Sequence, residues 1–236
     1  MKKTKKITAI VCAYNEQDTV FDVANSLMES PLTTEVIVIN DGSTDRTSSV
    51  LKKLPAIPKL KIIEFETNRG KGWAMAEGIT AASGEIIVFV DADLLNFNEK
   101  YIAQLINPLL DGRADMVAGH PTINTVDDTF NPFKRFTGER AVFKKDILPL
   151  VKKIKESRFG VETLINIHYK SQKKRIKHIA LWGLEHPVKL QKYPVHKSAR
   201  LYISEVRDIT MAYLVSYSTI FLIVRESILN LKKVWR

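Results

Sequence analysis

The segment IIVFVDADLLNFN, residues 86–98, sets two aspartates one position apart at the end of an apolar run. Removing an ionised carboxylate from water costs on the order of several kcal/mol unless an opposite charge or hydrogen bonds compensate it. A capping role at a strand-to-helix turn would explain one aspartate more easily than two. Asp91 and Asp93 therefore indicate that a positive group stands beside them.

A second segment, NRGKGWAMAEG at residues 68–78, combines glycine with positive charge. Gly70 and Gly72 let the backbone approach a ligand closely, and a helix that begins here adds the positive end of its dipole. Arg69 and Lys71 supply full charges. The segment is typical of a phosphate-binding loop, and a plain helix start with solvated side chains is the alternative.

Short runs of β-branched residues alternate with stretches of helical periodicity, and the strands and helices that they predict would position these motifs. We expect strands over 7–14, 35–40, 61–66 and 85–91, each buried on both faces, a fifth over 114–119, and helices near 17–29, 44–54, 71–82 and 99–111. This alternation predicts an α/β fold with a mainly parallel sheet. In such a sheet, ligands bind beyond the carboxyl ends of the strands. The segments AYNE, NDGSTDRT, NRGKG and DAD all fall there.

The composition predicts one globular domain with at most an appendage, since 45% of the 236 residues are hydrophobic. One cysteine, Cys12, excludes a disulfide framework or a cysteine-rich zinc site and suggests a reducing compartment. The net charge of +10 favours nucleic acid, an anionic membrane surface or phosphorylated ligands as partners. The sequence has no recognised nucleic-acid-binding motif, so nucleic acid is not expected.

Their order and placement make these motifs resemble the family 2 glycosyltransferases of the GT-A fold, a group that includes enzymes like dolichyl-phosphate mannose synthase and glucosyl-3-phosphoglycerate synthase. The resemblance covers roughly residues 6–196 and is dense from Ile7 to Leu94. It implies a GT-A domain over residues 1–205, followed by a C-terminal helical extension. It also implies that a nucleotide-sugar is held by Ala13, Tyr14, Glu16, Asp41, Asn68, Arg69, Lys71, Asp91 and Ala92.

The resemblance also implies what stands beside the two aspartates. A nucleoside diphosphate brings two phosphates, and Mg²⁺ or Mn²⁺ bridging them to a hard carboxylate neutralises both sides. Asp93 is expected to ligate the metal directly and to act in catalysis, while Asp91 ligates it or contacts the ribose. In phosphoglycerate-type relatives a histidine completes the metal site, which points to His186, with His196 as its rival.

The second half of the chain is expected to choose the acceptor. FTGERAVFKKDIL, residues 136–148, resembles the family segment in which a glycine turn precedes an arginine near the phosphates or the acceptor. Arg140 is the candidate, with Glu139 beside it. FGVETLINI resembles the segment that closes over the donor sugar. There Glu162 would bind sugar hydroxyls or act as general base, although most inverting relatives have an aspartate where this chain has Thr163.

Residues 209–224, ITMAYLVSYSTIFLIV, carry no charge. Spanning a bilayer takes about 20 such residues, so this stretch is too short. Within the extension, residues 206–236, it is expected to lie on a membrane surface, to form a homodimer contact or to pack on the domain. The basic residues that flank it favour an anionic surface. We expect a cytoplasmic protein, either free or peripheral at the inner face of the membrane.

These features predict a metal-dependent glycosyltransferase that moves a sugar from a UDP- or GDP-sugar to a phosphate-bearing acceptor or to a lipid like polyprenyl phosphate. The alternatives are transfer to a small soluble phosphorylated acceptor, as in enzymes like glucosyl-3-phosphoglycerate synthase, a nucleotidyltransferase, and a non-catalytic nucleotide-sugar-binding protein. A nucleotidyltransferase usually carries a Gly-rich basic loop directly after the first strand, where this chain has AYNEQDTV. The intact DAD motif opposes a non-catalytic role.

Overall fold

The computed structural model describes residues 5–122, 138–157 and 160–185. The chain divides into two compact units, Met1–Val188 and Lys189–Arg236, and the second lies wholly outside the described residues. Three expectations therefore stay predictions: the domain boundary after residue 205, the helix within 206–236, and the metal-binding role of His186 or His196. Among the helices of the described part, none combines the length and the apolar character needed to cross a bilayer.

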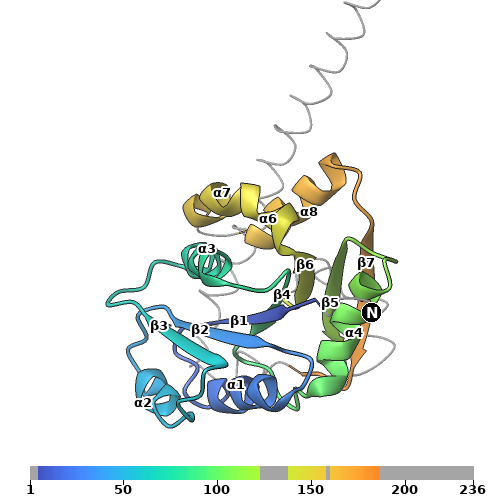
Figure 1. Cartoon of the computed structure of the whole chain (residues 1–236). Coiled ribbons are helices and arrows are strands. Elements are labelled where there is room, and N and C mark those ends of the chain that lie inside the picture. Colours follow the sequence, from blue (N-terminus) through green and yellow to red (C-terminus); the bar gives the residue numbers. More distant parts are fainter. Residues whose placement is uncertain (1–4, 123–137, 158–159, 186–236) are drawn as a thin grey trace, which may run out of the picture. The chain divides into compact units, whose positions relative to one another are not determined.

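A mixed sheet forms the centre of the first unit (Figure 1). Within the described residues its strands are β1 (Ile7–Ala13), β2 (Glu35–Asn40), β3 (Leu60–Glu64), β4 (Ile86–Asp91), β5 (Met116–Thr122), β6 (Arg140–Phe143) and β7 (Ile176–Trp182). Their order across the sheet is β3-β2-β1-β4-β6-β5-β7. β6 runs antiparallel to both of its neighbours, and all other pairs are parallel.

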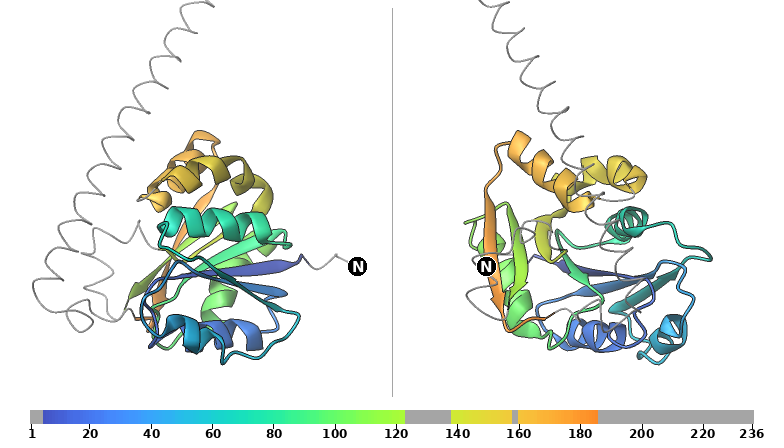
Figure 2. Two further views of the ribbon diagram at one scale, coloured as in Figure 1. Left: turned by 90° about the vertical axis from the view of Figure 1, so that its left-hand side faces the viewer. Right: turned by 180° about the vertical axis from the view of Figure 1, so that it is seen from behind.

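Helices cover both faces of the sheet, as the three views in Figures 1 and 2 show. One face carries α1 (Val20–Glu29), α2 (Thr47–Leu51) and α4 (Glu99–Leu110). The other carries α3 (Lys71–Ala81), α6 (Lys144–Ile147), a 3₁₀ turn (Leu148–Leu150), α7 (Val151–Glu156) and α8 (Val161–Ser171). Successive residues of β1 point to opposite faces, so Val11 packs with the α1 layer and Ile10 with the α3 layer.

The structure confirms the predicted α/β class with a mainly parallel sheet. The five expected strands all form, and their ends lie within three residues of the predicted ones. Two features differ from the expectation. β6 and β7 were not predicted, and β3 is partly exposed because it is an edge strand with a single neighbour.

Gly72 allows α3 and α7 to lie in direct contact. A Cβ at this position would come closer than 3.0 Å to the carbonyl oxygen of Ser157 at the end of α7. Across the same contact, Lys155 Nζ lies 2.6 Å from Oε1 of Glu77 and 4.2 Å from the centre of the Trp73 ring. The start of α3, which carries Lys71 of the predicted phosphate loop, is thereby fixed against the second half of the domain.

Gly72→Ala is expected to lower the free energy of unfolding by about 3 kcal/mol, because overpacking against a rigid backbone group costs that much. Gly112→Ala is the matched control. No atom lies within 4 Å of a Cβ there, and only the positive φ of +67° opposes the change, a strain of about 1 kcal/mol. Urea unfolding measures both losses, and equal values would show that α3 and α7 can move apart freely.

Candidate active site

Four parallel strands end at one edge of the sheet, and the charged segments of the sequence follow them. β1 lies between β2 and β4, with Ala13 opposite Asn40 and Cys12 opposite Asp91. β3 continues the same direction beyond β2. The segments after all four strands therefore meet along this edge, as the sequence predicted, and β1 is the centre of the candidate site.

Asp41 is buried after β2 and anchors the loop before α3. Its Oδ1 accepts a hydrogen bond from the backbone N of Arg69 at 2.7 Å, and its Oδ2 accepts one from the backbone N of Gly70 at 2.8 Å. Nδ2 of Asn68 also donates to Oδ2, at 3.1 Å. A Cβ at Gly42, whose φ is +66°, would collide with the same loop. Two backbone N–H groups of the predicted phosphate loop are thus bonded to Asp41.

Hydrogen bonds also join the segments after β1 and β2. The backbone N of Asn15 donates to Oγ of Ser43 at 3.0 Å, and the backbone N of Glu16 donates to Oγ1 of Thr47 at 2.9 Å. Asn15 adopts a φ of 59°, a left-handed conformation that asparagine tolerates better than most residues. With its neighbours fixed in this way, Tyr14 is 45% exposed and presents its ring to solvent at the strand ends.

Lys71, the first residue of α3, joins Asp91 to Glu162. Its Nζ lies 2.9 Å from Oδ1 of Asp91 and 2.9 Å from Oε1 of Glu162. Burial alone would lower the pKa of Lys71, but the two carboxylates raise it well above its ordinary value. Burial alone would raise the pKa of Glu162, but Lys71 and Arg140 lower it. We call the side chains of Lys71, Asp91 and Glu162 the Lys71 bridge. Its lysine and Glu162 are therefore both charged at neutral pH.

Arg140 and Glu139 are fully buried at the start of β6. Burial lowers the pKa of Arg140, and the carboxylates of Glu162, Asp91 and Glu139 oppose that effect. The carboxylates around the Lys71 bridge thus outnumber the two cations among the described residues. Such an excess of negative charge suits the binding of a metal ion.

Cys12 borders the same charged groups. Burial raises the pKa of its thiol to about 12, Lys71 opposes this, and the carboxylates of Asp91 and Asp41 add to it. The thiol therefore stays protonated at neutral pH and is neither a nucleophile nor a thiolate ligand.

The expected metal ligands lie only partly within the described residues. Asp93 is half-buried in the turn that follows β4, and Ala92 before it is buried. In the described ranges no three His, Cys, Asp or Glu side chains come together in a way that could hold a metal ion, and His186 lies outside those ranges. The carboxylates of Asp91 and Asp93 fit the preference of Mg²⁺ and Mn²⁺ for hard oxygen ligands. Further ligands must come from elsewhere.

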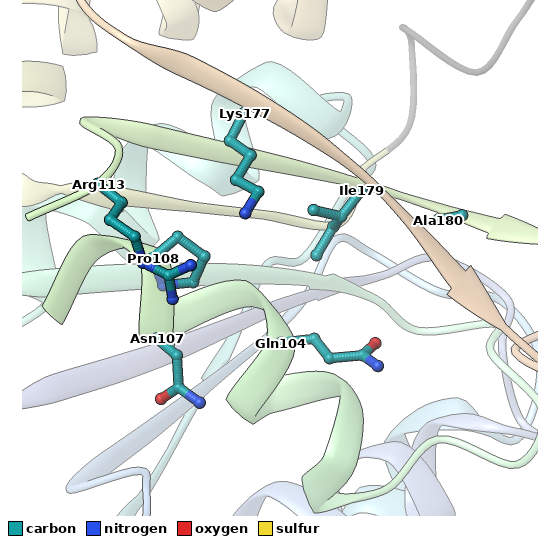
Figure 3. A pocket seen from close by; sticks show the side chains of 7 residues that line it. All are labelled: Gln104, Asn107, Pro108, Arg113, Lys177, Ile179 and Ala180. Carbon is teal, nitrogen blue, oxygen red and sulfur yellow. The ribbon is translucent and has the colours of Figure 1, made fainter. Parts of the chain in front are cut away.

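A groove of about 280 Å³ lies apart from this edge, between α4 and β7 (Figure 3). Two of its lining residues are basic, but Arg113 already pairs with Asp111 at 2.5 Å. No residue that the sequence singled out lines the groove. The rest of its lining is formed by Gln104, Asn107, Pro108, Lys177, Ile179 and Ala180. The groove is therefore not part of the candidate site.

Residues 8–171 match the family model described as Glycosyl transferase family 2. The chain belongs to glycosyl transferase family 2. The matched range runs from β1 to the last residue of α8, so it contains Asp41, Asp91, Arg140 and Glu162 but not His186.

A solved structure of a similar protein supports the GT-A fold of this family 2 chain. Glucosyl-3-phosphoglycerate synthase from Mycobacterium tuberculosis, in complex with Mn²⁺, uridine diphosphate and glucosyl-3-phosphoglycerate, matches with a TM-score of 0.66 at 21% identity. The match covers 88% of this chain and 80% of that one. A likeness at this level of identity concerns the fold.

Curated relatives within the family are longer than this chain. Poly-beta-1,6-N-acetyl-D-glucosamine synthase from Staphylococcus epidermidis is 26% identical over 186 residues, which are 78% of this chain and 43% of that protein. Glucosyl-3-phosphoglycerate synthase from Mycolicibacterium paratuberculosis is 33% identical over 121 residues, 47% of this chain and 35% of that protein. The chain thus spans less than half the length of these relatives.

Sequence reasoning missed two features of this family 2 site. It named Lys71, Asp91 and Glu162 separately but did not predict that one ammonium joins them, since three distant segments supply them. It also did not predict that both carboxylate oxygens of Asp41, a residue expected to bind the nucleotide, accept hydrogen bonds from the loop before α3.

Lys71→Met is expected to lower the free energy of unfolding at neutral pH by about 1–2 kcal/mol, a value reduced for solvent screening because the lysine is 40% exposed. Methionine keeps the length of the side chain and removes its charge. The folded-state pKa of Glu162 lies below its ordinary value of 4.5. The bridge therefore stabilises the wild type above that pH, and its contribution disappears as the pH falls through the folded-state pKa.

Urea unfolding of wild type and variant at several pH values measures this difference, which should shrink in the acid range. Lys52→Met, at an exposed lysine on the end of α2, serves as the control and should show no such dependence. A difference for Lys71→Met that stays constant from neutral to acid pH would contradict the bridge.

Proposed function

We propose that the protein transfers a sugar from a nucleoside-diphosphate donor to a phosphate-bearing acceptor, in a reaction that depends on Mg²⁺ or Mn²⁺. The observation that carries the proposal is the Lys71 bridge at the convergent strand ends of a family 2 chain. It sets Asp91, from the nucleotide-binding half, within reach of Glu162, from the second half. A donor bound along this edge has its diphosphate beside the first carboxylate and its sugar beside the second.

The donor side is assigned to the segments after β1 and β2 and to the loop before α3. The exposed ring of Tyr14 offers a surface for stacking of the base, and Glu16 with Ala13 faces the nucleoside. Asp41 acts by holding Asn68 and the loop, so the phosphates are left to Lys71 and to the N-terminus of α3. Structures of glucosyl-3-phosphoglycerate synthase hold uridine diphosphate with Mn²⁺ or Mg²⁺, which favours a UDP-sugar here.

The metal ion is assigned to Asp91 and Asp93, with His186 as the further ligand from the chain. When bound, such an ion stabilises the charge that grows on the leaving diphosphate. Arg140 is fully buried. We assign it to the support of Glu162 from within the protein, where its charge lowers the pKa of that carboxyl.

Glu162 suits the binding of sugar hydroxyls better than the removal of a proton. Its pKa is lowered by Lys71 and Arg140, and a weakly basic carboxylate is a poor general base at neutral pH. An acceptor whose phosphate oxygen attacks the sugar needs no base, because that oxygen is already ionised. Structures of glucosyl-3-phosphoglycerate synthase also hold phosphoglyceric acid, which independently favours a small phosphorylated acceptor. The hydroxyl of such an acceptor, unlike a phosphate oxygen, must lose a proton when it attacks.

A lipid phosphate acceptor at the inner face of a cytoplasmic membrane is the second candidate. It rests on the net charge of +10 and on the uncharged stretch 209–224 with its basic flanks. The same stretch is the candidate for a homodimer contact. Assaying transfer to phosphoglyceric acid and to a short polyprenyl phosphate, with one donor and one protein preparation, distinguishes the two acceptors.

Asp93→Asn is expected to abolish sugar transfer and the Mn²⁺-dependent binding of UDP while the fold is retained, because the lost metal ligand supports leaving-group stabilisation worth on the order of several kcal/mol. For the wild type, UDP with Mn²⁺ should raise the melting temperature and UDP with EDTA should not. Asp111→Asn, at an exposed ion pair, is the control. Normal turnover by Asp93→Asn, or equal melting shifts with Mn²⁺ and EDTA, would refute the metal-dependent donor site.

A further inference from the structure

We infer that Gly138 is a positioning residue for Asp91, because only a residue without a side chain lets the Asp91 carboxylate lie where Lys71 holds it. The inference deepens the proposed function, in which Asp91 faces the donor diphosphate and its metal ion. It concerns the segment just before β6, where the second half of the domain returns to the edge of the nucleotide-binding sheet.

The strand register brings the two residues together. β4 and β6 pair antiparallel, with Ile86 opposite Phe143 and Phe89 opposite Arg140. Continuing this register for two more residues sets Asp91 opposite Gly138. Directly opposed residues in an antiparallel pair have Cβ atoms about 5 Å apart. A side chain at position 138 would therefore compete with that of Asp91 for the same space.

The contact is with the functional group of Asp91 itself. A Cβ at Gly138 would lie closer than 3.0 Å to Oδ1, Oδ2 and Cγ of Asp91. The φ of Gly138 is not in the positive region, unlike that of Gly42 or Gly70, so its backbone would accept alanine. Glycine is thus required here by the neighbouring carboxylate and not by the conformation of the chain.

Lys71 binds the same carboxylate. Its Nζ is 2.9 Å from Oδ1 of Asp91 and is bound to Glu162 at the same distance. An alanine at position 138 leaves two ways to relieve the collision. Either Asp91 turns away from the ammonium, or the start of β6 moves and takes Arg140 with it. Each would change the charged site and leave the packing of the two hydrophobic layers intact.

The test is Gly138→Ala, alone and combined with Asp91→Ala, with the binding of UDP in the presence of Mn²⁺ measured by calorimetry. Gly138→Ala should weaken binding by about tenfold or more, as expected for the loss of a hydrogen bond to a charged group. In the Asp91→Ala background the same change should add no further loss. Gly112→Ala, the same substitution at a site with no neighbour within 4 Å, should bind UDP like the wild type.

A second measurement needs no ligand. In urea unfolding, Gly138→Ala should destabilise the wild type, because it displaces Asp91 from Lys71, and should not destabilise Asp91→Ala, where the colliding atoms are gone. Equal losses in both backgrounds would overturn the role of Gly138. If the wild type fails to bind UDP with Mn²⁺ but the unfolding losses still depend on Asp91, the proposed donor site is wrong and the positioning role stands.

Discussion

The ammonium of Lys71 is the point on which the candidate site depends, because it joins three segments that are far apart in the sequence. Asp91 ends β4, Glu162 lies in the first turn of α8, and Lys71 begins α3. The N-terminus of α8 stabilises a carboxylate, whereas a lysine at the N-terminus of α3 stands against the dipole of its own helix. The two carboxylates compensate for this, so the cation and the acidic residues stabilise each other. That balance also makes the bridge responsive to a bound diphosphate or metal ion, since either would compete for a member of it.

Asp41 holds a second part of the candidate site in place and changes the role expected of the glycine-rich segment. Backbone N–H groups of such loops are the usual phosphate ligands, yet those of Arg69 and Gly70 are bonded to Asp41. The guanidinium of Arg69 lies over the rings of Phe65 and Trp73, at 5.4 and 5.0 Å from their centres. Asp41 and the two aromatic rings therefore hold the loop. The positive charge that this segment presents at the strand ends is mainly that of Lys71.

Local signals explain what could be predicted from the sequence and what could not. Strands β1 to β4 form over apolar runs rich in β-branched residues, and the charged segments follow those strands. The α/β class and the edge that carries the candidate site could therefore be predicted. β6 is four residues long and β7 mixes exposed and half-buried positions, so neither has a periodicity to recognise. The Lys71 bridge and the contact of Gly138 with Asp91 join residues 20 to 91 positions apart in the sequence. Composition and spacing carry no information about such pairs, and the three-dimensional packing of α3, β6 and α8 is needed to bring them together.

The antiparallel insertion of β6 links the two halves of the site. β6 lies between β4 and β5 and is hydrogen-bonded to both, so its position does not depend on the length of the connection that precedes it. Because β6 runs opposite to β4, its first residues lie at the edge where β4 ends. Arg140 and Gly138 are therefore set beside Asp91 by the same backbone ladder that holds β4 in the sheet.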